Sequence, residues 1–433
     1  MIRSLGTISI WLFGLGFLFA GVNINEPYLI SLRGLGAAAL FISSIVVLIF
    51  IIIERGSRNG RGIAGRLLIL LWCLPSLSML YADTLFEVRK RNVLQTDGVR
   101  ARTLGQHFVV GYSSLDEVVQ LAEKGLIAGV YIARHNIAGR PAEALKSEIA
   151  ELQERRRIAG LPPLIVAADQ EGGIVSHLSP PLTALPSLST LADLPPDIRA
   201  KKAEDFGHTH GQELATLGVN QDFAPVLDLR PEAGRNRFDF NTLINQRAIS
   251  GDPATVADIA LAYVRGLDAF DVGATVKHFP GLGRVRTDTH HFSADLDTPL
   301  AVLEASDWRP FRDVLADSKA RLMIGHVTLS AVDPDRPASH SKRVISGIIR
   351  QKWNYQGVII TDDLVMGAIY NHDVCTAVVE ALNASVDLLL VAYDGSQFYR
   401  IFACASGAFS QGRLDMATLR DSETRLQRTL PPD

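Results

Sequence analysis

Eight short apolar runs, rich in β-branched residues, recur between about residue 105 and residue 391, with longer amphipathic stretches between them. Such alternation is typical of a parallel sheet whose strands are joined by helices. Eight repeats over about 330 residues predict an α/β fold of the TIM type, a (β/α)8 barrel. The predicted strands are Phe108–Val110, Gly129–Ile132, Leu164–Ala168, Phe223–Leu227, Ala274–Val276, Leu322–Ile324, Val358–Ile360 and Leu388–Val391.

One of the connecting helices is clear in the sequence. Asp252 can cap it, Pro253 fits its first turn, and an apolar face follows at helical spacing. That face consists of Val256, Ile259, Ala260, Tyr263, Val264 and Leu267. An open doubly wound sheet is the rival architecture, but no glycine-rich phosphate motif follows the first strand.

The N-terminal part of the chain is more apolar than the rest. Ser4–Asn25 and Gly34–Ile53 are uncharged over 22 and 20 residues, about the length of a helix that crosses a bilayer. Leu67–Ala82 is a third uncharged stretch, which is shorter and contains Pro75. We therefore expect the barrel to be preceded by about three transmembrane helices.

The expected helices lie near residues 5–25, 34–53 and 65–85. The first of them also fits a cleaved signal peptide, because Arg3 is followed by an apolar run. We expect a transmembrane region over residues 1–90 and a catalytic barrel over residues 91–433.

Basic residues in the loops predict the orientation, because they stay preferentially in the cytoplasm. Glu54–Arg66 contains four arginines and one glutamate, whereas Val22–Arg33 contains one of each. Three crossings with the arginine-rich loop inside would make this a multi-pass membrane protein with its barrel on the periplasmic or extracellular side. A third segment that only lies on the membrane surface would leave the barrel in the cytoplasm.

Composition narrows the classes of partner. The chain has 43 Lys+Arg against 46 Asp+Glu and a net charge of -3, which gives no indication of nucleic-acid binding. Cys73, Cys375 and Cys404 are too few for a disulfide scaffold and lack metal-ligand spacing, so we expect core or membrane residues.

Polar residues fall where the predicted strands end. Asp169 follows one run, Lys277 and His278 another, His326 a third, and Thr361–Leu364 a fourth. In a barrel the carboxyl ends of the strands converge at one mouth. We therefore expect these side chains to form one pocket.

Several of these residues suit glycosidic chemistry. Asp362 or Asp363 can act as a nucleophile at an anomeric carbon, although either can also cap the next helix. In Asp288-Thr289-His290 a carboxylate close to a histidine can support an acid/base, although a loop histidine without a role has the same spacing.

Asp169, Lys277 and His278 can hydrogen-bond sugar hydroxyls. Without further context Arg247 is as suited to a surface ion pair as to a ligand, and we expect Asp222 and Asp228 to be structural.

Taken together, the segments resemble the family 3 glycoside hydrolases, in particular their bacterial β-N-acetylglucosaminidase branch. The matching segments occur in the family's order from about Arg100 to the C-terminus. They are 168–173 (ADQEGG), 218–228 (GVNQDFAPVLD), 245–248 (NQRA) with Asp252-Pro253, 277–281 (KHFPG), 288–290 (DTH) and 361–364 (TDDL).

The resemblance implies a retaining exo-β-N-acetylglucosaminidase that releases terminal N-acetylglucosamine from cell-wall-type glycans. Asp362 would be the nucleophile, and His290, oriented by Asp288, the acid/base. The terminal sugar would be held by Asp169, Arg247, Lys277, His278 and His177. Neither cofactor nor metal is implied, the substrate is a small carbohydrate, and a monomer is expected.

The chain departs from the family pattern at three positions. Ile174 and His177 stand where the family usually has arginines, and Leu282 replaces a usual histidine. These departures affect the expected sugar contacts and the loop that carries His290.

Four alternatives remain open. A β-glucosidase of the same family usually carries a second domain, for which the sequence after the barrel leaves no room, and a phosphorylase would use phosphate in place of water. A metal-dependent barrel hydrolase would use His278, His290, His326, Asp362 and Asp363. A membrane-tethered sugar-binding module without catalysis would keep only the pocket.

Overall fold

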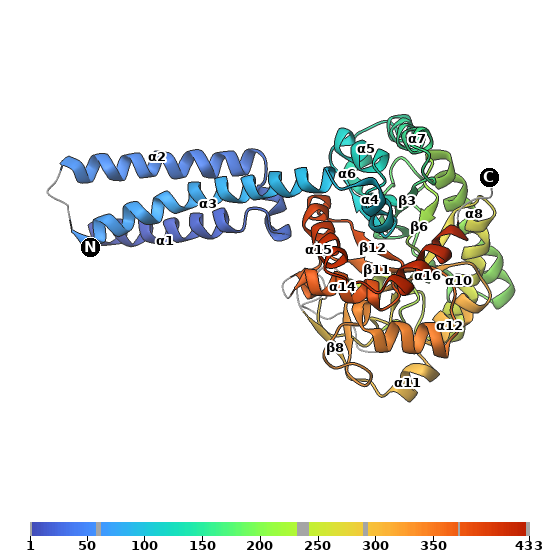
Figure 1. The fold of residues 1–433 in the computed structure, drawn as a ribbon. Helices are drawn as coiled ribbons and strands as arrows, with labels where there is room; N and C mark the ends of the chain where they lie inside the picture. The colour runs from blue at the N-terminus through green and yellow to red at the C-terminus, as the bar shows by residue number, and fades with distance from the viewer. Residues whose placement is uncertain (1, 58–61, 232–241, 289–292, 371–372, 430–433) are drawn as a thin grey trace. The chain divides into compact units, whose positions relative to one another are not determined.

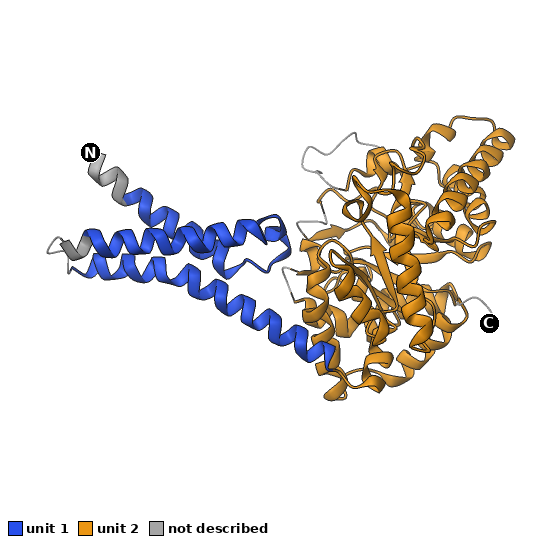
Figure 2. Ribbon diagram, turned by 90° about the horizontal axis from the view of Figure 1, so that it is seen from above, with its two compact units in different colours: residues 1–95 blue, residues 96–433 orange. Residues whose placement is uncertain are grey.

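The computed structural model describes residues 2–57, 62–231, 242–288, 293–370 and 373–429. The chain divides into two compact units, residues 1–95 and residues 96–433 (Figure 2). Each unit has a hydrophobic core of its own.

The first unit consists of three long helices and one short 3-10 helix. They are α1 (Ile2–Val22), η1 (Pro27–Leu32), α2 (Leu35–Ser57) and α3 (Ile63–Leu94). The buried ring of Trp72 on α3 packs 5.2 Å from the ring of Phe17, and its indole N–H donates to the carbonyl of Ile10 on α1 at 3.2 Å. Gly21 permits this close packing, because a Cβ there would lie 2.8 Å from the carbonyl oxygen of Pro75.

Two described helices are long and apolar enough to cross a membrane, namely Leu35–Glu54 and Ile63–Leu94. The apolar part of α1, Ile8–Val22, is shorter. The third helix is longer than the expected 65–85, because α3 continues through Pro75 to Leu94. Length and composition are all that mark these helices, and a signal sequence shares both properties.

The second unit is a closed barrel of eight parallel strands, as the sequence predicts (Figure 1). Each strand pairs with the next one along the barrel, and the last pairs with the first, for example Val109 with Leu390. The strands are β1 (Phe108–Gly111), β2 (Gly129–Ile132), β3 (Ile165–Ala168), β6 (Gln221–Asp222), β7 (Gly273–Phe279), β9 (Arg321–Ile324), β11 (Ile359–Asp363) and β12 (Leu388–Val391).

Helices connect successive strands and follow the last one. The longer ones are α5 (Leu115–Glu123), α7 (Ala142–Ile158), α8 (Pro196–Leu217), α10 (Pro253–Asp268), α12 (Arg309–Ala316), the π-helix η4 (Arg343–Lys352), α14 (Val374–Asn383), α15 (Phe398–Ser410) and α16 (Met416–Gln427). The short ones are α4 (Gly98–Gly105), α6 (Arg134–Ile137), η2 (Leu188–Leu191), α9 (Ile244–Arg247), α11 (Leu300–Ala305), η3 (Ala338–His340), α13 (Gly367–Tyr370) and η5 (Gly395–Gln397). Two small sheets accompany the barrel: β4 (Gln170–Gly172) with β5 (Val175–Ser176), and β8 (Ala294–Leu296) with β10 (Val327–Leu329).

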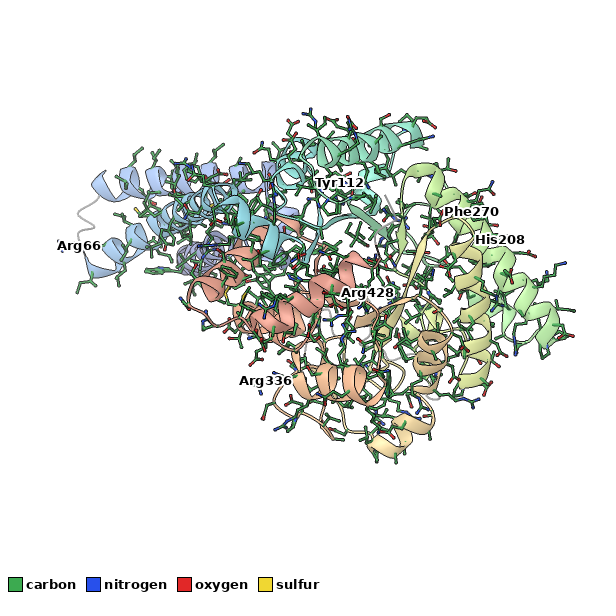
Figure 3. All side chains as sticks on the ribbon, turned by 45° about the vertical axis from the view of Figure 1, so that its right-hand side comes forward. Arg66, Tyr112, His208, Phe270, Arg336 and Arg428 are labelled. Atoms are coloured by element: carbon green, nitrogen blue, oxygen red, sulfur yellow. A yellow bond between two sulfur atoms is a disulfide. The ribbon has the colours of Figure 1, made fainter. Side chains whose placement is uncertain are left out.

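The predicted helix after Asp252 is confirmed as α10. The Asp252 carboxylate accepts a hydrogen bond from the backbone N–H of Thr255 at 2.8 Å, which satisfies one free N–H of the first turn. Its apolar face packs against α8, and just beyond the helix the ring of Phe270 meets His208 edge to face, with ring centroids 5.7 Å apart (Figure 3).

The predicted position of the fourth strand is wrong. The sequence predicts Phe223–Leu227, whereas the strand is Gln221–Asp222 and shares no residue with that run. Pro225 has no N–H to donate, so the regular ladder ends before it. The segment nevertheless continues beside β7, because the N–H of Leu227 donates to the carbonyl of Lys277 at 2.7 Å.

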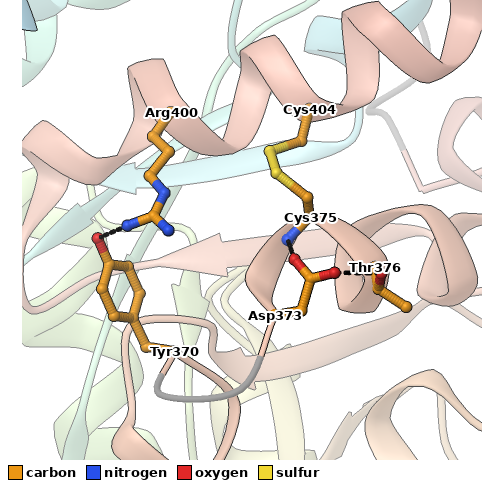
Figure 4. Close-up of a disulfide and its surroundings, with 6 residues drawn as sticks. All are labelled: Tyr370, Asp373, Cys375, Thr376, Arg400 and Cys404. Atoms are coloured by element: carbon orange, nitrogen blue, oxygen red, sulfur yellow. Dashed lines mark hydrogen bonds between the residues drawn. A yellow bond between two sulfur atoms is a disulfide. The ribbon is translucent and has the colours of Figure 1, made fainter. Parts of the chain in front are cut away.

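The expectation for two of the cysteines is also wrong. Cys375 on α14 and Cys404 on α15 form a disulfide, with their Cα atoms 5.1 Å apart (Figure 4). They belong to successive helices that pack side by side, a proximity that the spacing along the chain does not reveal. Cys73 is free.

Candidate active site

The polar residues that follow the strands meet at the carboxyl-terminal mouth of the barrel, as expected. Asp169 follows β3, Lys277 and His278 lie within the last residues of β7, and Asp362 ends β11 together with Asp363. Because all eight strands are parallel, these ends share one side.

A buried ionic network occupies this mouth. The Lys277 ammonium contacts both Asp169 and Glu171, the second at 2.7 Å. Arg247, at the end of α9, donates two hydrogen bonds to Glu171, from Nη2 to Oε1 at 2.6 Å and from Nε to Oε2 at 3.0 Å. Arg247 therefore belongs to this buried network, and its described ion pair lies in the interior rather than on the surface.

The network keeps its members charged. Burial alone would raise the pKa of Glu171, but attraction to Arg247 and Lys277 outweighs burial and lowers it. Burial likewise opposes the charge of Lys277, and attraction to Asp169 and Glu171 raises the pKa of this ammonium above its usual value. The result is a mouth lined with fixed donors and acceptors, which suits the recognition of hydroxyl groups.

His278 is held by Asp228. The Asp228 carboxylate lies 2.7 Å from Nδ1 of His278 and accepts the backbone N–H of Leu282 at 2.7 Å. When Nδ1 of a histidine is bonded to a carboxylate, Nε2 is the ring nitrogen left for other partners. In His278, Nε2 lies 3.3 Å from Nη2 of Arg247. Asp228, which was expected to be structural, therefore positions a residue of the pocket.

Asp169 and His177 are joined by a tyrosine. The hydroxyl of Tyr131 on β2 donates to Oδ2 of Asp169 at 2.6 Å. The hydroxyl oxygen of Tyr131 also lies 2.9 Å from Nδ1 of His177. His177, which follows β5, is thereby linked to Asp169 at the mouth of the barrel.

The two aspartates at the end of β11 have different surroundings. Asp363 is buried and accepts the backbone N–H groups of Val365, Ala392 and Tyr393, which ties the ends of β11 and β12 together. Burial raises the pKa of Asp363 to about 6, against the opposing effect of these hydrogen bonds. Asp362 is half-buried, and its Oδ1 accepts the backbone N–H of Asp363 at 2.8 Å. The Asp363 carboxylate therefore joins two strand ends, whereas the described hydrogen bond of Asp362 is to the residue that follows it.

Asp288 is buried, and its Oδ1 accepts a hydrogen bond from the hydroxyl of Thr242 at 3.2 Å. The carbonyl of Thr242 in turn accepts from Nη1 of Arg247 at 2.9 Å, which links Asp288 to the ionic network. His290, the expected acid/base, lies outside the described residues.

His326 follows β9 and contacts the β11 end. Its Nε2 lies 2.9 Å from the carbonyl of Asp363, and its Nδ1 lies 2.8 Å from the hydroxyl of Ser339. Within the described ranges, no group of three or more His, Cys, Asp or Glu side chains is arranged to hold a metal ion.

Three pocket residues were not assigned to the pocket from the sequence. Glu171 lies in the segment 168–173, two residues after Asp169, and this position at a strand end is a signal for it in the sequence. Asp228 lies 50 residues from His278, so the sequence gives no sign that the two side chains interact. Tyr131 has no sequence signal, because an aromatic residue in an apolar strand normally indicates core packing.

Comparisons with known proteins agree with this geometry. The model of the glycosyl hydrolase family 3 N-terminal domain matches residues 100–429. The beta-hexosaminidase of Actinobacillus succinogenes is 34% identical over 289 residues, which cover 66% of this chain and 79% of that protein. The beta-hexosaminidase of Xylella fastidiosa strain 9a5c is 35% identical over 289 residues, which cover 66% and 82%.

Solved structures are also similar. A glycoside hydrolase family 3 beta-N-acetylglucosaminidase from Paenibacillus sp. FPU-7 superposes with a TM-score of 0.69 at 31% identity; the match covers 76% of this chain and 61% of that one. A family 3 member from Mycobacterium smegmatis gives 0.68 at 28% identity and covers 78% and 99%. The matched family model and these relatives show that the chain belongs to glycosyl hydrolase family 3 and is a glycoside hydrolase.

Proposed function

We propose that the chain is a retaining exo-β-N-acetylglucosaminidase. The relatives named as beta-hexosaminidases, at about one-third identity over most of their length, support the substrate class. The observation that carries the proposal is the buried network of Asp169, Lys277, Glu171 and Arg247 at the mouth that also holds Asp362. It supplies fixed donors and acceptors for one terminal sugar beside a half-buried carboxylate.

In the proposed reaction Asp362 attacks the anomeric carbon. The glycosidic bond breaks, and the leaving oxygen takes a proton from the imidazolium of His290. In the second step neutral His290 takes a proton from water, water attacks the anomeric carbon, and Asp362 leaves, so the configuration is retained. The role of Asp288 is to orient His290, from which it is two residues away.

Hydrolysis of chromogenic β-N-acetylglucosaminide and β-glucoside by the full chain in detergent tests the proposal. We expect preference for the acetamido sugar, loss of activity in Asp362→Ala, and at least about a hundredfold fall in kcat in His290→Ala, the scale of general acid–base catalysis. Asp313→Ala is the matched control, because this carboxylate pairs with Arg309 on the surface of α12.

The anomer formed first distinguishes the mechanism. A retaining enzyme releases the β-anomer of N-acetylglucosamine, which proton NMR detects before mutarotation. Release of the α-anomer, turnover in Asp362→Ala, or a β-glucoside preference would each contradict the proposal. Formation of a sugar 1-phosphate in phosphate buffer would move the assignment to a phosphorylase.

We further propose that residues 1–90 anchor the barrel of residues 91–433 to the membrane, with the barrel on the periplasmic or extracellular side. Large apolar side chains point outward along the first unit, among them Phe13 (65% exposed) and Phe50 (63% exposed). The disulfide between Cys375 and Cys404 supports an oxidising compartment for the barrel. On that side, cell-wall-type glycans and their fragments are the proposed substrates.

Reporter fusions after Asp433 test this orientation. Alkaline phosphatase, which is active only outside the cytoplasm, should be active, and green fluorescent protein should be dark when exported unfolded. The reverse pattern would place the barrel in the cytoplasm.

A further inference from the structure

Tyr131 is fixed between Asp169 and His177. Its side chain is 5% exposed, and its ring stacks on that of Phe223, with centroids 5.9 Å apart and planes 13° from parallel. Packing therefore sets the position of the hydroxyl, which lies 2.6 Å from Oδ2 of Asp169 and 2.9 Å from Nδ1 of His177.

The hydrogen atoms of this trio can be assigned by counting them. A tyrosine hydroxyl has one hydrogen to donate, and an ionised carboxylate can only accept. Burial raises the pKa of Asp169, but the Lys277 ammonium and the hydrogen bonds from Lys277 and Tyr131 outweigh burial and hold it well below its usual value. The Tyr131 hydrogen therefore goes to Asp169, and Nδ1 of His177 must carry a hydrogen and donate it to the Tyr131 oxygen.

The second ring nitrogen of His177 then has a defined polarity. Burial lowers the pKa of His177, Lys277 and Arg134 add to this effect, and Asp169 and Glu171 oppose it. A neutral ring with its hydrogen on Nδ1 carries a lone pair on Nε2. Across the described part of the chain, Tyr131 is the side chain that hydrogen-bonds to this ring, through Nδ1.

We propose that Tyr131 is a positioning residue that fixes the His177 tautomer, so that Nε2 of His177 accepts the hydrogen of one hydroxyl group on the substrate sugar. The inference rests on the proposed function and deepens it. An arginine or lysine at position 177 could only donate, whereas a neutral imidazole oriented in this way accepts. The site would therefore select a terminal sugar whose hydroxyl at this point is free, and would discriminate against a sugar substituted there by an ether, an ester or a further residue.

Fluorinated substrates test the polarity, because fluorine replaces a hydroxyl but cannot donate a hydrogen. Kinetics of the full chain in detergent would be measured with a chromogenic β-N-acetylglucosaminide and its 3-, 4- and 6-deoxyfluoro analogues. For the wild type we expect one analogue to raise KM about tenfold, the size of one lost hydrogen bond. In His177→Leu the ratio of KM between that analogue and the parent should fall to within about twofold.

Tyr131→Phe keeps the ring that packs on Phe223 and removes the hydroxyl. Nδ1 of His177 then loses its acceptor, and both tautomers become available. We expect KM for the parent substrate to rise about five- to tenfold with kcat unchanged within twofold, and the fluorine penalty to shrink as in His177→Leu. Tyr399→Phe is the matched control, since the buried Tyr399 hydroxyl on α15 also donates to a carboxylate, Glu117, at 2.6 Å. It should leave the fluorine penalty unchanged.

The outcomes separate this inference from the proposed function. If the parent substrate is hydrolysed but the fluorine penalties are the same in wild type, His177→Leu and Tyr131→Phe, the inference is wrong and the activity stands. If the wild type binds the sugars but does not hydrolyse them, the proposed activity is wrong. The inference is then decided by the ratio of dissociation constants, measured by calorimetry, between each fluorinated analogue and the parent sugar. No binding of any of the sugars would overturn both.

Discussion

Arg247 and Glu171 form a two-pronged ion pair with both side chains at least nine-tenths buried, and Glu171 simultaneously contacts the ammonium of Lys277 at 2.7 Å. One carboxylate thus holds two cations from different elements, α9 and β7. Such a residue need not touch substrate to be required for the pocket.

Glu171→Gln should therefore damage both stability and binding. Removing the charge leaves Lys277 paired with Asp169, and leaves Arg247 to the weaker electrostatic attraction of Asp169 and Asp228. Breaking a buried pair from one side costs about 3 kcal/mol, so the free energy of unfolding should fall by about that amount and KM should rise. Denaturant unfolding and steady-state kinetics measure the two effects.

The control for this variant is Glu151→Gln. Glu151 pairs with Arg155 on the surface of α7, where both side chains are over 40% exposed. An exposed pair contributes less than about 1 kcal/mol. Equal effects of the two substitutions would show that Glu171 has no special part in the pocket.

Asp228→Asn should weaken catalysis through His278. The Asp228 carboxylate accepts from Nδ1 and the backbone N–H of His278 through Oδ2, and from the backbone N–H of Leu282 through Oδ1. An amide has only one accepting oxygen for these two sides, so the substitution removes the acceptor of His278 or that of Leu282. Losing a hydrogen bond to a charged group costs about 2 kcal/mol, so kcat/KM should fall about thirtyfold. Unchanged kcat/KM with a lower melting temperature would instead make Asp228 purely structural.

The fold was largely predictable because apolar runs, helix caps and strand ends are local signals. Lys277 and His278 could be placed opposite Asp169 since parallel strands converge in any closed barrel. The contacts of Tyr131 and the pairing of Cys375 with Cys404 could not be predicted, because each depends on which neighbours a side chain meets across the fold. The shift of β6 was likewise not foreseen, although Pro225 is a visible strand breaker.

Asp222 should make stability depend on pH. Burial raises its pKa to about 8, and its oxygens lie 2.8 Å from the Tyr263 hydroxyl and 3.0 Å from the N–H of Gln170. The folded chain then keeps a proton that the unfolded chain releases near pH 4. Since the folded state binds more protons, the contribution of Asp222 is fully favourable below about pH 4 and is lost as pH rises towards 8.

Asp222→Asn mimics the protonated acid, because its amide can donate to the Tyr263 oxygen while its carbonyl accepts from Gln170. The melting temperature of this variant, relative to the wild type, should therefore increase between pH 5 and pH 8. A difference that stays constant over this range would show that Asp222 titrates at its ordinary pKa.

The disulfide should couple the stability of the barrel to redox conditions. Cys375 lies in the first turn of α14, which Asp373 caps, and Cys404 lies in α15 (Figure 4). A cross-link between residues 29 positions apart lowers the entropy of the unfolded chain, which raises the free energy of unfolding by about 3.6 kcal/mol. Reductant should lower the melting temperature of the wild type, and Cys375→Ser should show the lower value with or without reductant.

Cys73→Ser is the control, because Cys73 is free and its loss should leave the response to reductant intact. If reductant changes nothing in the wild type while labelling shows both thiols exposed, the bond contributes no stability, and its support for an oxidising compartment falls with it.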